Sequence, residues 1–332
     1  MTHRLRHSHA PSRPAPYSGP LEEFRRHFDS DVSALGLPSV PGYRLHREIG
    51  KGGMGRVYLA SDESGRECAL KLFPNFPEWD ESAYLKEWFL RECAALLAIS
   101  HPNVVSSFEA GATEDFLYLS MEVVRGRTLH RLLQEEGPLP WPAAKSVMDG
   151  VCAGLHAAHE TGVVHRDIKP ENVLVVESNG GISVKVIDFG LCHIDGYEEI
   201  YSYVHSLEHP FAPQISPVDG DFGTPEFRPP EFDEPGMNKR RTFDVYSAGV
   251  LLFEMVCGRH PLHPGSPGGA VLPGFLRSLQ FSGLHKNGKV PKPSELGIRM
   301  PEKAESALMR SLEKSPAHRF ASMEEMRDAM AL

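Results

Sequence analysis

The pattern of apolar and polar residues marks three short strand-like stretches early in the chain. Segment 43–49 approaches the period of two that is typical of β-strands, and the mainly apolar segments 57–60 and 67–73 also read as strands, with turn residues between them. An apolar run at 116–124 is expected to add a further strand. This part of the chain is therefore predicted to fold as a small antiparallel sheet.

Helical periodicity dominates elsewhere. Residues 79–99 contain neither Gly nor Pro and carry apolar side chains at helical spacing, which predicts one helix within the strand-rich part. Gly180 and Gly181 lie between two apolar runs, which is typical of a β-hairpin. Further helices are predicted at 141–160, 245–257, 301–312 and 323–330.

The N-terminal residues have a different composition. Segment 1–20 is basic and rich in His and Pro, so it is expected to be a disordered basic tail. Residues 21–35 place apolar residues at helical spacing among charged ones, which predicts a short amphipathic helix. Gly and Pro residues then form a linker, so that 21–42 is a helix and linker before the domain that starts at residue 43.

Composition narrows the function classes. The 332 residues carry 35 Lys plus Arg and 44 Asp plus Glu, a net charge of −9, which argues against a nucleic-acid partner. The five cysteines are scattered without a C-x-x-C, as is usual for reduced thiols, and we expect a cytoplasmic protein. No apolar run approaches the roughly 18 residues of a membrane span, so no membrane segment is expected in this chain.

One polar stretch carries the strongest chemical signal. His165-Arg166-Asp167-Ile168-Lys169-Pro170-Glu171-Asn172 supplies a carboxylate, a cation two residues later and an amide five residues later. A carboxylate that accepts a hydroxyl proton, a cation near phosphate and an amide that holds a metal are the parts of a phosphoryl-transfer site.

A glycine-rich loop supplies a second signal. Gly50, Gly52 and Gly55 have the spacing G-x-G-x-x-G, which lets a backbone approach phosphate closely. The same spacing occurs in dinucleotide folds, but there the loop opens into a helix. Here Val57 begins a strand, and the next strand carries Lys71 among apolar neighbours. A glycine-rich hairpin followed by a strand lysine is the protein-kinase order.

Taken together, these motifs resemble a bacterial-type serine/threonine protein kinase catalytic domain over residues 43–328. The resemblance implies an α+β, bilobal protein-kinase-like fold, with a small antiparallel lobe (43–122), a larger mainly helical lobe (125–328) and an activation segment (188–231). The N-terminal amphipathic helix is hypothesised to dock on the small lobe.

The same resemblance implies roles for single residues. ATP and Mg²⁺ (or Mn²⁺) are the expected cofactors, with Asn172 and Asp188 as metal ligands. Asp167, Lys169, Asn172 and Thr224 are the implied catalytic residues. The implied nucleotide-binding residues are Ile49, Gly50, Lys51, Gly52, Gly53, Met54, Gly55, Val57, Ala69, Lys71, Glu92, Met121, Glu122, Val124, Leu174 and Asp188. Glu92 is the implied partner of Lys71, with Glu87 as the competing candidate.

The resemblance also implies structural roles for residues in the C-terminal part of the chain. Glu231 is implied to pair with Arg319, and Asp244 to cap the backbone of the catalytic loop. The stretch 191–222 is longer than usual for the family and contains no Thr. If phosphorylation there activates the protein, the candidates are Ser202, Ser206, Ser216 or a tyrosine, with Ser202 or Ser206 hypothesised to control activity.

The expected function is therefore a serine/threonine protein kinase that acts on protein substrates and phosphorylates itself. A pseudokinase or scaffold is the alternative from another class, although Lys71, Asp167 and Asp188 are all present. A small-molecule kinase is a third alternative, which the Lys169-Pro170-Glu171-Asn172 run disfavours. Similar bacterial kinases form homodimers, and for this chain a homodimer stays an open alternative.

Overall fold

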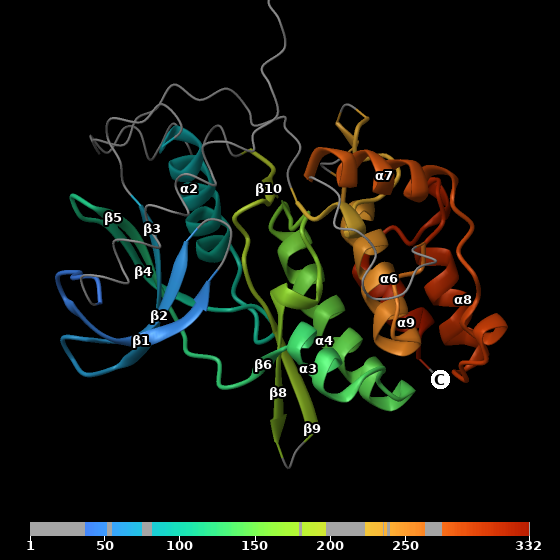
Figure 1. Cartoon of the computed structure of the whole chain (residues 1–332), viewed down its shortest axis with the longest axis horizontal. Helices are drawn as coiled ribbons and strands as arrows, with labels where there is room; N and C mark the ends of the chain where they lie inside the picture. The colour runs from blue at the N-terminus through green and yellow to red at the C-terminus, as the bar shows by residue number, and fades with distance from the viewer. Residues whose placement is uncertain are drawn as a thin grey trace, which may run out of the picture.

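The structure is a computed structural model that describes residues 37–51, 55–74, 82–178, 181–196, 223–234, 236–237, 240–262 and 274–331. A sheet-rich lobe and a mainly helical lobe stand side by side in it, as Figure 1 shows. The predicted helix 21–35 and the three candidate serines of 191–222 lie outside the described residues. The α+β, bilobal arrangement expected from the sequence is confirmed.

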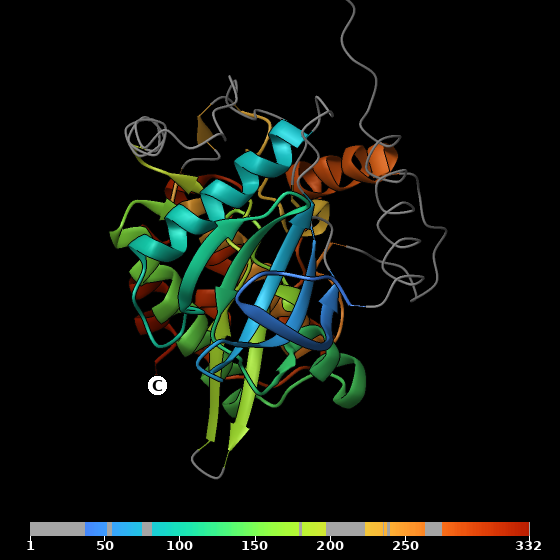
Figure 2. The same ribbon diagram turned by 90° about the vertical axis from the view of Figure 1, so that its left-hand side faces the viewer.

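The small lobe is a five-stranded antiparallel sheet in the order β1-β2-β3-β5-β4. Its strands are β1 (Tyr43–Lys51), β2 (Arg56–Asp62), β3 (Glu67–Pro74), β4 (Ser107–Ala112) and β5 (Phe116–Met121). Figure 2 looks onto this sheet. The central strand β3 is buried from Cys68 onward, because β2 and β5 flank it and side chains cover both of its faces.

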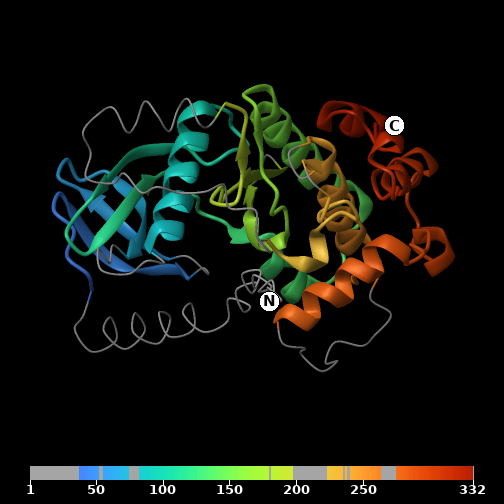
Figure 3. The ribbon, with the colours of Figure 1, turned by 90° about the horizontal axis from the view of Figure 1, so that it is seen from above.

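The strand register places the candidate nucleotide residues on one face. Lys71 pairs with Val57 on β2 and with Leu119 on β5, and Ala69 pairs with Met121. Side chains directly opposite each other, and those two residues apart on one strand, share a face of the sheet. Helix α2 (Ser82–Ala98) lies between the sheet and the large lobe, as seen in Figure 3.

The large lobe is built on helices around a short hairpin. Strands β8 (Val173–Ser178) and β9 (Gly181–Val186) pair antiparallel, β6 (Arg127–Thr128) extends their sheet, and β7 (Val163–Val164) pairs with β10 (His193–Ile194). The α-helices of the described part are α3 (Leu129–Glu136), α4 (Trp141–Glu160), α6 (Thr242–Cys257), α7 (Gly274–Asn287), α8 (Glu302–Ser311) and α9 (Met323–Ala329). Short 3-10 turns are η1 (Pro170–Asn172), η2 (Pro225–Phe227), η4 (Pro293–Leu296) and η5 (Pro316–His318).

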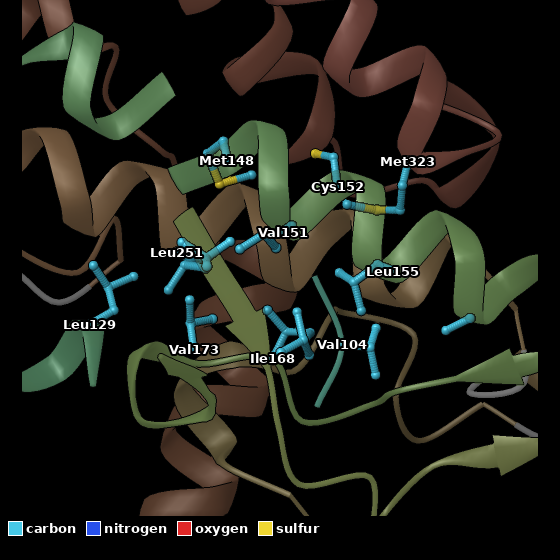
Figure 4. Packing of buried hydrophobic residues seen from close by; sticks show 14 of the residues in the cluster. Val104, Leu129, Met148, Val151, Cys152, Leu155, Ile168, Val173, Leu251 and Met323 are labelled. Atoms are coloured by element: carbon cyan, nitrogen blue, oxygen red, sulfur yellow. The ribbon is translucent and has the colours of Figure 1, made fainter. Parts of the chain in front are cut away.

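Helices α4 and α6 form the centre of this lobe. Figure 4 shows Val151 and Leu155 of α4 among other buried apolar side chains, including Leu251 of α6, Ile168 and Met323. Thirteen of the sixteen residues of α6 are buried. A helix that is apolar on all sides must be surrounded by protein, so α6 gives the catalytic loop a rigid support.

One loop of the small lobe attaches directly to the large lobe. Val104, which lies between α2 and β4, forms a parallel bridge with Val186 at the end of β9. Val186 N donates to Asn103 O at 2.8 Å, and the Asn103 side-chain amide donates to Val184 O at 2.9 Å. Gly154 of α4 packs so close to Asn103 that a Cβ there would lie 2.8 Å from its carbonyl oxygen. The base of the small lobe is therefore fixed to β9.

Most predicted elements are confirmed at near their predicted bounds, including α4 at 141–160 and the hairpin β8–β9. Helix α7 was not predicted, and Gly283 in its interior weakens the helical pattern. Within the described residues, no helix combines the length and apolar content needed to cross a bilayer.

Candidate active site

The catalytic loop runs from β7 to η1, and the buried carboxylate of Asp244 fixes its backbone through hydrogen bonds. Asp244, near the start of α6, accepts the backbone N–H groups of His165 at 2.8 Å and Arg166 at 2.9 Å, and it also contacts His159 Nε2 at 2.7 Å. Burial alone would raise the pKa of Asp244, but the hydrogen bond and charge of His159, the charge of His165 and the Arg166 N–H together outweigh burial and hold that pKa below its usual range. The cap predicted for Asp244 is thus present in the structure.

Arg166 adopts a backbone conformation that is unusual for a side chain of its size. Its φ is +66°, a left-handed value that needs support from surrounding structure. The Asp244 carboxylate supplies that support, and the Arg166 guanidinium donates to the carbonyl oxygens of Leu191 at 2.8 Å and Cys192 at 3.3 Å. The turn orients the next residue, Asp167, which is 5% exposed.

Asp167 is the centre of a dense hydrogen-bond network. Its Oδ2 accepts from Lys169 Nζ at 2.6 Å and from Asn172 Nδ2 at 3.1 Å. Its Oδ1 accepts from both the backbone N–H and the hydroxyl of Thr224 at 3.0 Å, and Lys169 also reaches Thr224 Oγ1 at 2.8 Å. All four implied catalytic residues therefore meet at one carboxylate.

Lys71 joins the small lobe to Asp188, two residues after the end of β9. Its Nζ lies 2.7 Å and 2.8 Å from the two carboxylate oxygens of Glu92 on α2, and 2.9 Å from Asp188 Oδ1. Burial disfavours the Lys71 ammonium, but the carboxylates of Asp188 and Glu92 outweigh burial and raise the pKa of Lys71. The side chain therefore carries a positive charge at physiological pH.

Glu92, and not Glu87, is the partner of Lys71. Glu87 lies one turn earlier on α2, where its Oε1 accepts from Arg91 Nε at 2.6 Å. The resemblance favours Glu92 with Glu87 as the competing candidate, and the ion pair in the structure is the one with Glu92.

Asp188 has the second unusual backbone of the site, with φ at +67°. Its side chain is 35% exposed. Partial burial by itself would raise the pKa of the Asp188 carboxyl. The charge and hydrogen bond of Lys71, together with the charges of His165 and Lys169, outweigh burial and lower the pKa of Asp188. The ring of the following Phe189 is buried and lies 4.6 Å from the His165 ring, which fixes the turn.

The donor set fits a hard divalent cation. The Asn172 amide nitrogen donates to the Asp167 carbonyl and carboxylate oxygens, so the amide oxygen, Oδ1, is the atom left to bind metal. Asp188 adds a partly exposed, ionised carboxylate. Mg²⁺ binds through one or two such protein ligands together with phosphate oxygens and water. Among the described residues there is no cluster of three or more His, Cys, Asp or Glu that suggests a different metal.

The glycine loop is described at both of its ends. Gly55 packs against β3 so closely that a Cβ would lie 2.3 Å from Leu72 O, so only glycine fits there. Gly52, Gly53 and Met54 lie outside the described residues. Val57, Ala69 and Met121 share the Lys71 face of the sheet, while Ile49 and Lys51 are exposed at the end of β1.

Backbone hydrogen bonds fix the conformation of the segment after β5. The Glu122 N–H donates to Ser106 O at 3.0 Å, and the Val124 carbonyl accepts from Gly126 N at 3.0 Å. Leu174 of β8, the remaining implied nucleotide contact, pairs with Lys185 in the hairpin.

The end of the activation segment is anchored by a buried ion pair. Both terminal nitrogens of Arg319 donate to Glu231, at 2.6 Å and 2.7 Å, and both side chains are almost fully buried. This is the pair implied by the sequence. Two further residues of the site were not assigned a role from sequence: Lys185, whose ammonium contacts Glu122, and Arg228, whose guanidinium contacts Gly223.

Comparisons with known proteins agree with this geometry. The family described as "Protein kinase domain" matches residues 43–330. The chain is similar to a probable serine/threonine-protein kinase, CPE1738, of Clostridium perfringens (30% identity, covering 86% of this chain and 37% of the relative). It is also similar to PrkC of Bacillus subtilis (28%, covering 86% and 39%) and to PksC of Streptomyces coelicolor (34%, covering 86% and 48%), both named serine/threonine-protein kinases. The chain spans less than half the length of each of these curated relatives.

Proposed function

Because the chain belongs to the protein kinase family, we propose that it is an active serine/threonine protein kinase. It transfers the γ-phosphate of ATP to Ser and Thr hydroxyls of protein substrates and also phosphorylates itself. The observation that carries this proposal is the convergence of one network around Asp167 and another around Asp188, each containing a lysine. We assign the reaction to the cytoplasm, where ATP is available.

In this proposal Asp167 orients the attacking hydroxyl and accepts its proton. Lys169 and Thr224 hold the carboxylate in place, and Lys169 then meets the charge of the transferred phosphoryl group. Such transfer needs little covalent chemistry from the protein, so positioning and electrostatic stabilisation account for most of the rate.

The nucleotide is assigned to the Lys71 face of the small-lobe sheet. Lys71 contacts the α- and β-phosphates, and backbone groups of Glu122 and Val124 bind the adenine edge. Asn172 and Asp188 would hold Mg²⁺ or Mn²⁺, which when bound neutralises charge on the phosphates. The intact Lys71–Glu92 and Lys71–Asp188 contacts support an active enzyme over a pseudokinase.

The test is transfer of radiolabelled phosphate from ATP to the protein itself and to a generic protein substrate. Asp167→Asn is expected to lower transfer by ~10²-fold or more, because it removes the general base. Asp115→Asn, a change of the same kind at an exposed position before β5, is expected to leave transfer unchanged.

Two results would contradict the proposal. Wild-type protein that binds ATP but labels nothing is a pseudokinase. Protein that labels metabolites, but neither itself nor a protein substrate, is a small-molecule kinase.

A further inference from the structure

Arg228 is a buried cation that the mechanism above does not use. It lies between η2 and Glu231, at the end of the activation segment, and is only 7% exposed. Taking a guanidinium out of water is costly unless its N–H groups are satisfied and its charge is compensated. Its contacts therefore show what it holds in place.

The contacts of Arg228 with described residues include Gly223, Ser278 and Phe232. One terminal nitrogen donates to the carbonyl oxygen of Gly223 at 2.6 Å, and the other donates to Ser278 Oγ of α7 at 3.1 Å. The guanidinium carbon lies 4.4 Å from the centre of the Phe232 ring, within the range of a cation–π interaction. Arg228 thus connects the residue before Thr224 to helix α7, which Figure 3 shows along the edge of the large lobe.

Gly223 is the point where this connection meets the catalytic carboxylate. Its φ is +83°, and a Cβ built on it would lie 3.5 Å from Asp167 Oδ1 and 3.7 Å from Arg228 Nε. The guanidinium and the Asp167 carboxylate therefore both lie within 4 Å of the position that a Cβ of residue 223 would occupy. The positive φ means that any other side chain at position 223 would be strained.

The connection works through a single peptide plane. The Gly223 carbonyl and the Thr224 N–H belong to the same planar, trans peptide group, so they point in opposite directions. Arg228 binds the carbonyl end at 2.6 Å, and Asp167 Oδ1 binds the N–H end at 3.0 Å. Fixing one end of a rigid plane fixes the other.

We propose that Arg228 is a positioning residue for phosphoryl transfer. It orients the Gly223–Thr224 peptide so that the Thr224 N–H holds the Asp167 carboxylate in its reactive orientation, and it ties that orientation to α7 through Ser278. The effect on rate rests on the kinase activity proposed above, whereas the effect on the peptide does not.

The test combines hydrogen exchange with kinetics on Arg228→Met. Loss of the guanidinium is expected to speed amide exchange in residues 223–228 by about tenfold, because the peptide loses its anchor. It is also expected to lower kcat by about tenfold while the KM for ATP stays unchanged, since only the geometry at Asp167 is altered. Arg228→Lys keeps the charge but not the forked donor pair, so it is expected to recover only part of the rate.

Two controls separate this role from general destabilisation. Arg299→Met, at an exposed position before α8, is expected to match wild type in both measurements. Ser278→Ala removes one contact of Arg228 and is expected to give the same changes in weaker form, which keeps the test available if Arg228→Met does not fold. Unchanged exchange over 223–228 in a folded variant overturns the proposal, whatever the activity. Inactive wild-type protein with the expected exchange change overturns the proposed kinase activity instead.

Discussion

The ammonium group of Lys185 lies 2.5 Å from Glu122 Oε1, which joins strand β9 to the segment that follows β5. The same Lys185 nitrogen donates to the carbonyl oxygen of Val104 at 3.2 Å, and the same Glu122 oxygen accepts from the Ser106 N–H at 2.8 Å. Three segments therefore meet at one ion pair, and one of them carries the backbone assigned to adenine.

Lys185→Met is expected to weaken ATP binding without a change in kcat. A hydrogen bond to a charged group contributes about 1.5–3 kcal/mol, so the KM for ATP should rise by roughly tenfold. Lys185→Arg, which keeps a donor and a charge, is the matched control and should recover most of the affinity. Steady-state kinetics with varied ATP give the result, and an unchanged KM in the Met variant would falsify this role.

The pairing of Lys71 with Glu92, while Glu87 pairs with Arg91, predicts unequal effects of two similar changes. Glu92→Gln removes the charge that holds the Lys71 ammonium and should lower kcat/KM for ATP by about 10²-fold. Glu87→Gln alters a contact on the same helix that does not touch Lys71, so its loss should be much smaller. Equal losses in the two variants, measured at matched folded fractions, would contradict the assignment.

The buried pair of Glu231 and Arg319 predicts a change in stability. Removing one partner leaves an uncompensated buried charge, which costs about 3–5 kcal/mol. Arg319→Met should therefore lower the melting temperature by about 6 °C or more. Arg327→Met, at a more exposed arginine of α9, serves as the control and should melt close to wild type. A melting temperature unchanged in Arg319→Met would show that the pair is dispensable.

Glu254 of α6 predicts a pH dependence of stability. Burial, reinforced by the Glu171 and Glu226 carboxylates, raises the pKa of Glu254 to about 7. A raised folded-state pKa contributes stability at pH values below the unfolded value of about 4.3, and this contribution is lost as the pH rises toward 7. Glu254→Gln, which cannot ionise, should therefore raise the melting temperature at pH 8 by roughly 2–4 °C.

The same variant should show little gain at pH 4, where wild-type Glu254 is protonated in the folded protein. Melting curves of both proteins across this pH range are the measurement. A gain of equal size at pH 4 and pH 8 would mean that ionisation of Glu254 is not its cause.

The catalytic loop was predictable because its residues lie at fixed offsets in a short stretch. Asp167, Lys169 and Asn172 lie within six residues of chain, and their local turn brings them together. To predict the partner of Lys71 one must also know how α2 is rotated about its axis. This rotation decides whether Glu87 or Glu92 faces the sheet. Sequence periodicity places both residues on the helix but does not fix its rotation to within one turn.

Arg228 and Lys185 show what sequence patterns do not reveal. Lys185 alternates with Val184 and Val186 in a manner typical of a solvated strand residue, and only tertiary packing places the Glu122 carboxylate and the Val104 carbonyl beside it. Arg228 is separated by fifty residues from Ser278, which lies on α7, a helix that the sequence pattern does not predict. Both contacts depend on tertiary packing between segments distant in the chain.

The bridge between Val104 and Val186 has a consequence for how the protein comes apart. Strand β9 counts as part of the helical lobe, yet it supplies one side of a backbone pairing whose other side belongs to the sheet lobe. Melting either lobe would break hydrogen bonds that the other lobe needs. The two lobes should therefore unfold as one cooperative unit, with a single calorimetric transition.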